Sequence, residues 1–310
     1  MKRAARWSWG LVRDIEAEWQ RDRVGGLSAE IAFFALLGFF PTVVVLAAAL
    51  GSADGILGEN NAAEIENWLV EQMIGVFGGD NTLESTVSDL FAGSNGGALT
   101  IGLVIAVYAA SRGFVAVVRA LDVAYDHQQQ RGFLSTRVVG FGLTLLTVVA
   151  AAVVLTLVVV GPLFGGAEEL AQRLGAAGWF PVVWNWFRWP VVFVSLVGWA
   201  ATVFHIAPNH RSPWKLEVPG AVVSSLWWTV VSLGFGRYLA VASDGANAVF
   251  GLLGGAISLL FWLYLMSMGL LLGAEVNSIA ARRLGLVIEP RPRAGLGETV
   301  ARWRRYSRRS

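Results

Sequence analysis

The stretch AVFGLLGGAISLLFWLYLMSMGLLLG, residues 248–273, contains no charged residue. An α-helix rises about 1.5 Å per residue, so a helix of this length can cross the roughly 30 Å hydrocarbon core of a bilayer. The run ends in AEVNSIAARR (274–283), where polar and charged residues return. The stretch therefore predicts a transmembrane helix with a charged edge. Its pairs Gly251-xxx-Gly255 and Gly269-xxx-Gly273 predict close packing against another helix of the same chain.

Five further apolar stretches precede this one. The whole chain is 55% hydrophobic and 15% charged, whereas soluble domains carry roughly 25% charge. We therefore predict an all-α, polytopic membrane protein with six transmembrane helices inside a transmembrane domain of residues 31–278. The expected spans are residues 31–51, 97–118, 138–161, 182–204, 218–241 and 248–273.

The basic residues predict the orientation of these spans. Of the 24 Lys and Arg residues, 21 fall in the N-terminal segment, the region 112–137, the loop 205–217 and the C-terminal tail. The loop 52–96 has none, but it has eight acidic residues. Because basic residues concentrate on the cytoplasmic side, we expect both termini in the cytoplasm and the loop 52–96 outside. The tail 279–310 is expected to be a basic, disordered cytoplasmic segment.

Two segments outside the spans have apolar residues at helical spacing. In the loop 52–96, apolar residues lie on one helical face and mainly acidic residues on the other, which predicts one or two amphipathic helices on the outer membrane surface or capping the bundle. In the segment 1–30, Trp7, Leu11, Ile15 and Trp19 repeat every four residues and predict a cytoplasmic amphipathic helix. The outer amphipathic face consists of Ile65, Trp68, Leu69, Met73 and Phe77.

Ionisable and amide residues gather at the cytoplasmic ends of the predicted spans. They form an expected inner-rim polar cluster, in which Arg112 and Glu275 lie at matching depth and are predicted to pair. Such residues tend to face protein or water and to pair with one another. A structural latch and a role in gating or headgroup binding both remain open for this cluster. Its members are Arg112, Arg119, Asp122, Glu275 and Asn277.

Two prolines and one turn are expected to shape the spans. Pro41 and Pro190 are expected to kink the first and fourth spans, because proline removes a helical hydrogen bond. The turn between the fifth and sixth spans is bracketed by polar residues on the outer side. This outer turn comprises Arg237, Asp244, Asn247 and Gly251.

The sequence contains no recognisable catalytic arrangement. It has no cysteine, and its three histidines have no HExxH spacing. Neither a GxxxxGK[ST] nor a GxSxG motif is present. We therefore expect no enzyme activity, no metal and no cofactor.

Several motifs resemble the YihY/virulence factor BrkB family of bacterial inner-membrane proteins, formerly labelled ribonuclease BN. They are LSAEIAFFALLGFFP (27–41), SRGFVAVVRALDVAYD (111–126), APNHR…W…VPGA (207–221), NAVFGLLGGAI (247–257) and LLLGAEVNS (270–278). The resemblance implies a six-helix protein of the bacterial cytoplasmic membrane. The sequence departs from the family pattern at three positions. The family tends to have a small residue where Glu30 stands and tyrosines where Phe34 and Phe250 stand.

The resemblance also implies movement of phospholipids or of lipid A precursors, which makes a lipid transporter or flippase the leading functional hypothesis. A channel or small-solute transporter is the alternative, although the spans offer few polar residues at mid-depth. A non-transporting envelope scaffold is a further alternative, and a ribonuclease is the least favoured. The expected partners are membrane lipids, with envelope proteins in addition and no nucleic acid.

Overall fold

The computed structural model describes residues 13–51, 96–126, 132–155, 180–242, 248–285 and 289–290, and almost all of them are helical. Residues 13–21 form a helix that ends where Arg23 adopts a left-handed φ of 51°. A single 3₁₀ turn, η2 (Trp214–Leu216), lies between the fourth and fifth long helices. The long helices are α2 (Val24–Gly51), α6 (Gly96–Ala124), α7 (Phe133–Leu155), α10 (Phe180–Ile206), α11 (Val218–Ala242) and α12 (Ala248–Arg283).

Among the described residues, four helices contain stretches that are long and apolar enough to cross a membrane. These stretches are Phe133–Ala151, Trp189–Ile206, Val218–Val241 and Gly254–Arg283. A shorter apolar stretch, Val24–Phe39, lies in α2. The all-α part of the predicted class is therefore confirmed for the described residues, which include helices able to span a membrane. The number of six spans, the domain boundaries and the side on which the termini lie stay predictions.

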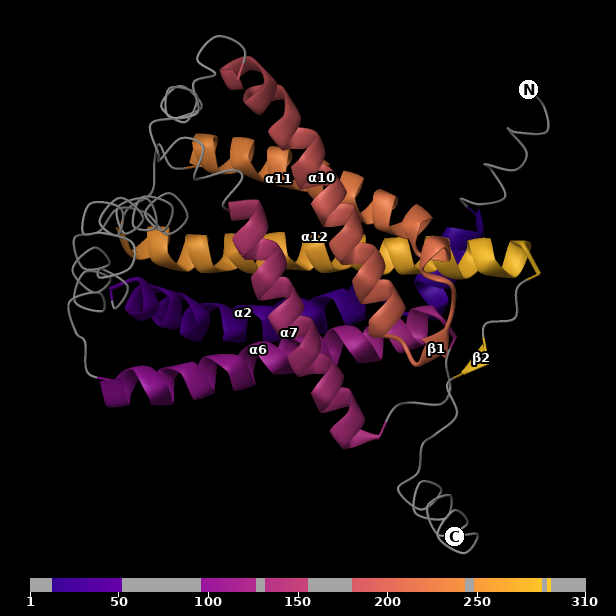
Figure 1. Cartoon of the computed structure of the whole chain (residues 1–310), viewed down its shortest axis with the longest axis horizontal. Helices are drawn as coiled ribbons and strands as arrows, with labels where there is room; N and C mark the ends of the chain where they lie inside the picture. Colours follow the sequence, from indigo (N-terminus) through magenta and orange to yellow (C-terminus); the bar gives the residue numbers. More distant parts are fainter. Residues whose placement is uncertain are drawn as a thin grey trace, which may run out of the picture.

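The helices form a bundle in which distant parts of the chain lie side by side. In Figure 1, α2 lies beside α6 and α11 beside α12, and α12 also contacts α2. Helices α7 and α10 cross this group obliquely, with α7 packed on α6 and α10 packed on α11 and α7. Helices α2 and α11 begin where α6, α10 and α12 end, at the right of Figure 1. We call this the charged end of the bundle.

Small residues bring α11 and α12 into close contact. A Cβ atom on Gly220 would overlap the carbonyl oxygen of Gly273, and one on Gly273 would overlap the hydroxyl of Ser224. The Ser224 hydroxyl donates to the carbonyl of Gly269, at 2.9 Å. The close packing predicted from Gly269-xxx-Gly273 is therefore confirmed, and the partner helix belongs to the same chain.

The interior of the bundle at the charged end combines apolar side chains with buried polar ones, while large apolar side chains elsewhere face outward. Leu121, Phe204 and Leu271, from α6, α10 and α12, are fully buried. Outward-facing residues include Leu145 in α7 and Val230 in α11. An apolar exterior of this kind suits a helix bundle surrounded by lipid, because hydrocarbon does not penalise exposed apolar groups.

Two short strands pair with each other at the charged end. Strand β1 (His210–Arg211) follows α10, and β2 (Glu289–Pro290) follows α12. They pair antiparallel, with His210 opposite Pro290. The pairing attaches the segment after the last helix to the loop between α10 and α11.

Candidate functional site

A pocket of about 320 Å³ opens between α2, α6 and α7 near the charged end. It contains three arginines, two from α6 and one from α7, and we call it the arginine pocket. Two carboxylates, Glu30 and Asp122, also line it. The complete lining is Glu30, Phe34, Arg112, Val115, Ala116, Arg119, Asp122, Phe133, Thr136 and Arg137.

Aromatic rings hold two of the three guanidinium groups in place. The Cζ atom of Arg112 lies 5.0 Å from the centre of the Phe34 ring. That of Arg137 lies 5.1 Å from the Tyr108 ring and 5.5 Å from the Phe133 ring. Such cation–π contacts stabilise an arginine by about 0.5–1 kcal/mol at exposed sites and leave the N–H edge of the fork available.

The arginines share the pocket with two carboxylates but make no direct ion pair with them. Within the described part of the chain, none of Arg112, Arg119 and Arg137 forms an ion pair. Asp122 is buried and accepts a hydrogen bond at 2.8 Å from the backbone N–H of Asn209. The pocket thus presents guanidinium donors, and such groups bind phosphate or carboxylate oxygens in a bidentate manner.

Helix α7 begins at this pocket with an exposed apolar face. The side chains of Phe133 and Leu134 are 74% and 72% exposed, although both are large and apolar. The exposed face continues along the helix at intervals of three and four residues, which keeps it on one side. Its further members are Val138, Phe141, Leu145 and Val148.

Asn277, predicted for the inner-rim cluster, lies in a separate buried network. Its side-chain oxygen accepts from the backbone N–H of Gly220 at 2.7 Å, at the start of α11. Its amide nitrogen donates to the carbonyl oxygen and to Oε2 of Glu217, both at 3.1 Å, and to the Tyr125 hydroxyl at 3.2 Å. Asn277 therefore joins α12, the start of α11 and the end of α6.

Tyr125 and Glu217 complete the same network. The Tyr125 hydroxyl donates to Oε2 of Glu217 at 2.5 Å, and the Ser212 hydroxyl donates to Oε1. Burial raises the pKa of Tyr125 well above its usual range, and the Glu217 carboxylate raises it further. The phenol therefore stays protonated and serves as a donor to the buried carboxylate.

The predicted pair of Arg112 and Glu275 is wrong. Arg112 lies in the arginine pocket against Phe34, whereas Glu275 is fully buried beside Glu18 and Asp22. The two side chains lie in different parts of the bundle, with Arg112 at the level of Phe34 and Glu275 at the level of Asp22. The charge nearest to Glu275 is thus acidic instead of basic.

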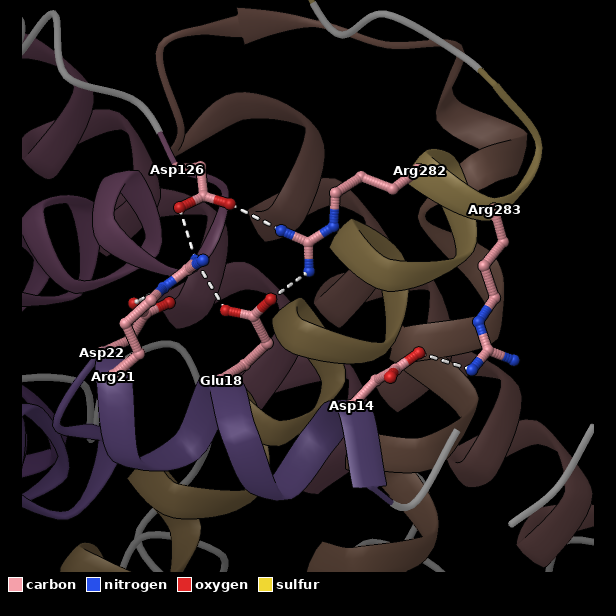
Figure 2. Close-up of polar contacts among 7 residues, drawn as sticks. All are labelled: Asp14, Glu18, Arg21, Asp22, Asp126, Arg282 and Arg283. Carbon is pink, nitrogen blue, oxygen red and sulfur yellow. Dashed lines mark hydrogen bonds and ion pairs between the residues drawn. The ribbon is translucent and has the colours of Figure 1, made fainter. Parts of the chain in front are cut away.

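A network of ion pairs covers this acidic group at the charged end (Figure 2). Asp126, after α6, accepts from Arg21 at 2.5 Å and from Arg282 at 2.6 Å. Glu18 pairs with the same two arginines, at 2.5 and 2.6 Å, and Arg283 pairs with Asp14 at 2.5 Å. Hydrogen bonds to Asp22 and Asp126 raise the pKa of Arg21 above its usual value.

The remaining predicted residues are dispersed or not described. Pro41 lies within α2, and Pro190 lies within α10, where it is exposed. Arg237 is exposed on α11, and Gly251 belongs to the first turn of α12. Other predicted residues lie outside the described part of the chain: Ile65, Trp68, Leu69, Met73, Phe77, Asp244 and Asn247, together with nearly all of the tail beyond residue 285.

Five residues of these sites were missed in the sequence. Arg137 and Glu217 were placed on the basic side but were not assigned to a site. Tyr125 follows Asp122 by three residues, and this helical spacing could have indicated that Tyr125 is buried. Because residues 1–30 were interpreted as a surface helix, Glu18 and Asp22 were not assigned to a site. Trp19, which lies between them in the sequence, packs against the core.

Comparison with known proteins identifies the family of the chain. The profile of the family described as virulence factor BrkB matches residues 16–296. The ribonuclease-like protein YfkH of Bacillus subtilis (strain 168) is 31% identical over 260 residues, which are 83% of this chain and 90% of that protein. A UPF0761 membrane protein of Stenotrophomonas maltophilia (strain K279a) is 32% identical over 125 residues, 39% of this chain and 26% of that protein.

No solved structure matches the chain. The family match covers nearly the whole sequence and includes all six long helices. The resemblance found in the sequence motifs is thereby confirmed. The chain is a membrane protein that belongs to the virulence factor BrkB family.

Proposed function

We propose that this protein is a multi-pass lipid transporter of the bacterial cytoplasmic membrane, which takes up phosphate-bearing lipids at the arginine pocket. The phospholipid and lipid A precursor classes both carry the required phosphate. In this proposal the charged end faces the cytoplasm, because the basic residues concentrate there.

The observation that carries the proposal is a set of three arginines in one pocket, none of which forms an ion pair with a described residue. A phosphate group offers several anionic oxygens, and the planar fork of arginine matches them in pairs. Hydrogen bonds to charged groups contribute about 1.5–3 kcal/mol each. Removing one arginine should therefore weaken phosphate binding about tenfold or more.

The exposed face of α7 supports a lipid over a soluble phosphate compound. Phe133 belongs to the pocket lining, and Leu134 and Val138 continue the apolar face away from it. A headgroup in the pocket would place its acyl chains against this face, inside the hydrocarbon region. A soluble anion would make no use of it.

The two alternatives predict different behaviour. A channel or small-solute transporter would pass ions without moving lipid. An envelope scaffold would bind a protein partner and move neither. No specific contact within the described residues favours either alternative, so the lipid transporter is the function that we test.

Reconstitution of the purified full-length chain tests the proposal directly. Liposomes with fluorescent phosphatidylglycerol in both leaflets should lose more than half of their fluorescence to external dithionite when the protein is present. Arg112→Gln, Arg119→Gln and Arg137→Gln should each slow this loss while thermal stability is retained. Lys215→Gln is the matched control, because it removes one exposed basic charge near the charged end but outside the pocket.

Binding measurements identify the source of the phosphate. Vesicles with phosphatidylglycerol should raise the melting temperature more than vesicles with phosphatidylcholine alone, and inorganic phosphate should raise it less. If lipid movement is absent, or is equal in the three arginine variants and the wild type, the proposal is wrong. Passage of small ions without lipid movement would favour the channel.

A further inference from the structure

Three carboxylates meet beneath the ion-pair network at the charged end. Glu18 and Asp22 come from the segment before α2, and Glu275 comes from the last turns of α12. One oxygen of each lies within 4.8 Å of the others. We call Glu18, Asp22 and Glu275 the carboxylate triad.

Two members of the triad have buried oxygens that accept no hydrogen bond. Glu275 has no exposed surface, and no donor contacts either of its carboxylate oxygens. Asp22 is also buried; Oδ1 accepts from Arg21 at 3.0 Å, while Oδ2 has no donor. Buried carboxylates are normally paired with donors or bind metal ions. The unpartnered oxygens of Glu275 and Asp22, gathered with an oxygen of Glu18, therefore point to a cation site.

The charges around the triad show the same deficit. The seven residues in Figure 2 contribute four carboxylates and three guanidinium groups. Glu275, beside them, adds a fifth carboxylate. The arginines contact Asp14, Glu18, Asp126 and only one oxygen of Asp22. In this group the five carboxylates outnumber the three guanidinium groups by two, and a divalent ion would offset this excess.

We infer that the carboxylate triad binds one divalent cation of the Ca²⁺ or Mg²⁺ type. Both ions prefer carboxylate oxygens, and water completes their coordination. Calcium–oxygen distances of about 2.3–2.6 Å allow two ligands of one ion to lie up to about 4.6–5.2 Å apart, so three oxygens within 4.8 Å of one another can share one such ion. Magnesium binds at about 2.0–2.1 Å and would draw the oxygens together. Glu18 can take part because each carboxylate oxygen has a second lone pair beside its arginine contact.

Such an ion would connect two distant parts of the chain. Glu18 and Asp22 precede α2, whereas Glu275 belongs to α12. The cation would hold the N-terminal segment against the end of the last helix, in addition to the ion pairs of Arg282 and Arg283. This inference is independent of the proposed lipid transport, because the triad shares no residue with the arginine pocket.

Thermal unfolding of the purified full-length chain in detergent tests the cation site. After treatment with EDTA, CaCl₂ or MgCl₂ at constant ionic strength should raise the melting temperature until the site is saturated. An excess of about a hundredfold over Kd should raise it by about 5 °C. Glu275→Gln should abolish this rise and should melt above the wild type in EDTA, because one unpaired buried charge is removed.

Glu16→Gln provides the matched control, since Glu16 lies on the same N-terminal helix but is exposed and outside the triad. This variant should keep the full response to the cation. Binding of Mn²⁺, followed by loss of the free-ion EPR signal, should give one ion per chain in the wild type and in Glu16→Gln, and none in Glu275→Gln.

Two results would overturn the inference. The first is a wild-type melting temperature that is equal in EDTA and in divalent salt, which would mean that Glu275 and Asp22 share a proton instead of a metal ion. The second is a rise, or Mn²⁺ binding, that persists unchanged in Glu275→Gln, which would place any cation elsewhere.

Discussion

Replacement of Asn277 by alanine should destabilise the bundle through the loss of a three-way junction. The side chain accepts the backbone N–H of Gly220, which lies within the first turn of α11 and has no partner inside that helix. A buried N–H left without an acceptor costs about 1–3 kcal/mol. The lost hydrogen bond to the Glu217 carboxylate adds about 1.5–3 kcal/mol. We expect a total of about 3–5 kcal/mol, because the Tyr125 hydroxyl still contacts Glu217.

The assay is thermal unfolding in detergent, followed by the intrinsic fluorescence of the 14 tryptophans. At about 2 °C per kcal/mol for a chain of this size, the melting temperature should fall by about 6–10 °C. Asn277→Asp should also destabilise, since the new carboxyl keeps the acceptor for Gly220 but meets the Glu217 carboxylate. Gln20→Ala removes an exposed side-chain amide and should change the melting temperature little.

The outcome decides between two interpretations of Asn277. A fall of less than about 2 °C, no greater than that of Gln20→Ala, would refute the structural role. If lipid movement were lost at the same time, the original assignment of Asn277 to an inner-rim binding cluster would be restored. A large fall with retained activity in the surviving protein would support the junction.

Three further predictions address packing, ionisation and orientation. Gly273→Ala should lower the melting temperature by about 2–6 °C, because its Cβ would overlap α11 and overpacking costs about 1–3 kcal/mol. Gly234→Ala, whose Cβ would meet open space, should not; equal falls would contradict the close packing. Since the pKa of Tyr125 is raised in the folded state, its stabilisation should be complete below about pH 10 and lost as the pH rises further. Melting temperatures at pH 8 and 10.5 should therefore differ less in Tyr125→Phe than in the wild type, and equal differences would exclude this linkage. A single cysteine at position 60 should react with an impermeant maleimide on intact cells and one at position 295 should not, whereas the opposite result would invert the topology.

Hydropathy located the long helices well but underestimated their length. The sixth span was expected to end at residue 273, yet α12 continues to Arg283. The additional turns contain Glu275, Asn277 and Ser278, which are polar and buried. An apolar run marks only the part of a helix that meets hydrocarbon, so polar residues packed inside the protein are mistaken for the end of the helix. The start of α2, seven residues before the expected span, has the same cause.

The candidate site shows that the expected depth of two residues along their spans does not tell which residues contact each other. Arg112, Arg119 and Asp122 were predicted together and do share a pocket, because they lie on one helix at spacings of three and seven residues. Glu275 was assigned to Arg112 only because both were expected at the same depth, whereas Arg112 lies beside Phe34 and Glu275 beside Asp22. The direction in which each faces depends on how α2, α6 and α12 are rotated and packed, and a single sequence carries no record of it.

The contact between α11 and α12 also has a consequence for biogenesis. The indole N–H groups of Trp227 and Trp228 donate to carbonyl oxygens of Leu265 and Met266, both at 2.8 Å, and Ser224 donates to Gly269. Helix α11 carries all three donors, but their acceptors are synthesised later, on α12. A nascent chain that has released α11 alone into lipid would expose these donors to hydrocarbon, where nothing can accept them. Release of both helices from the translocon as one hairpin avoids this exposure, and a stalled or truncated chain ending after α11 would present the quality-control machinery with unsatisfied polar groups.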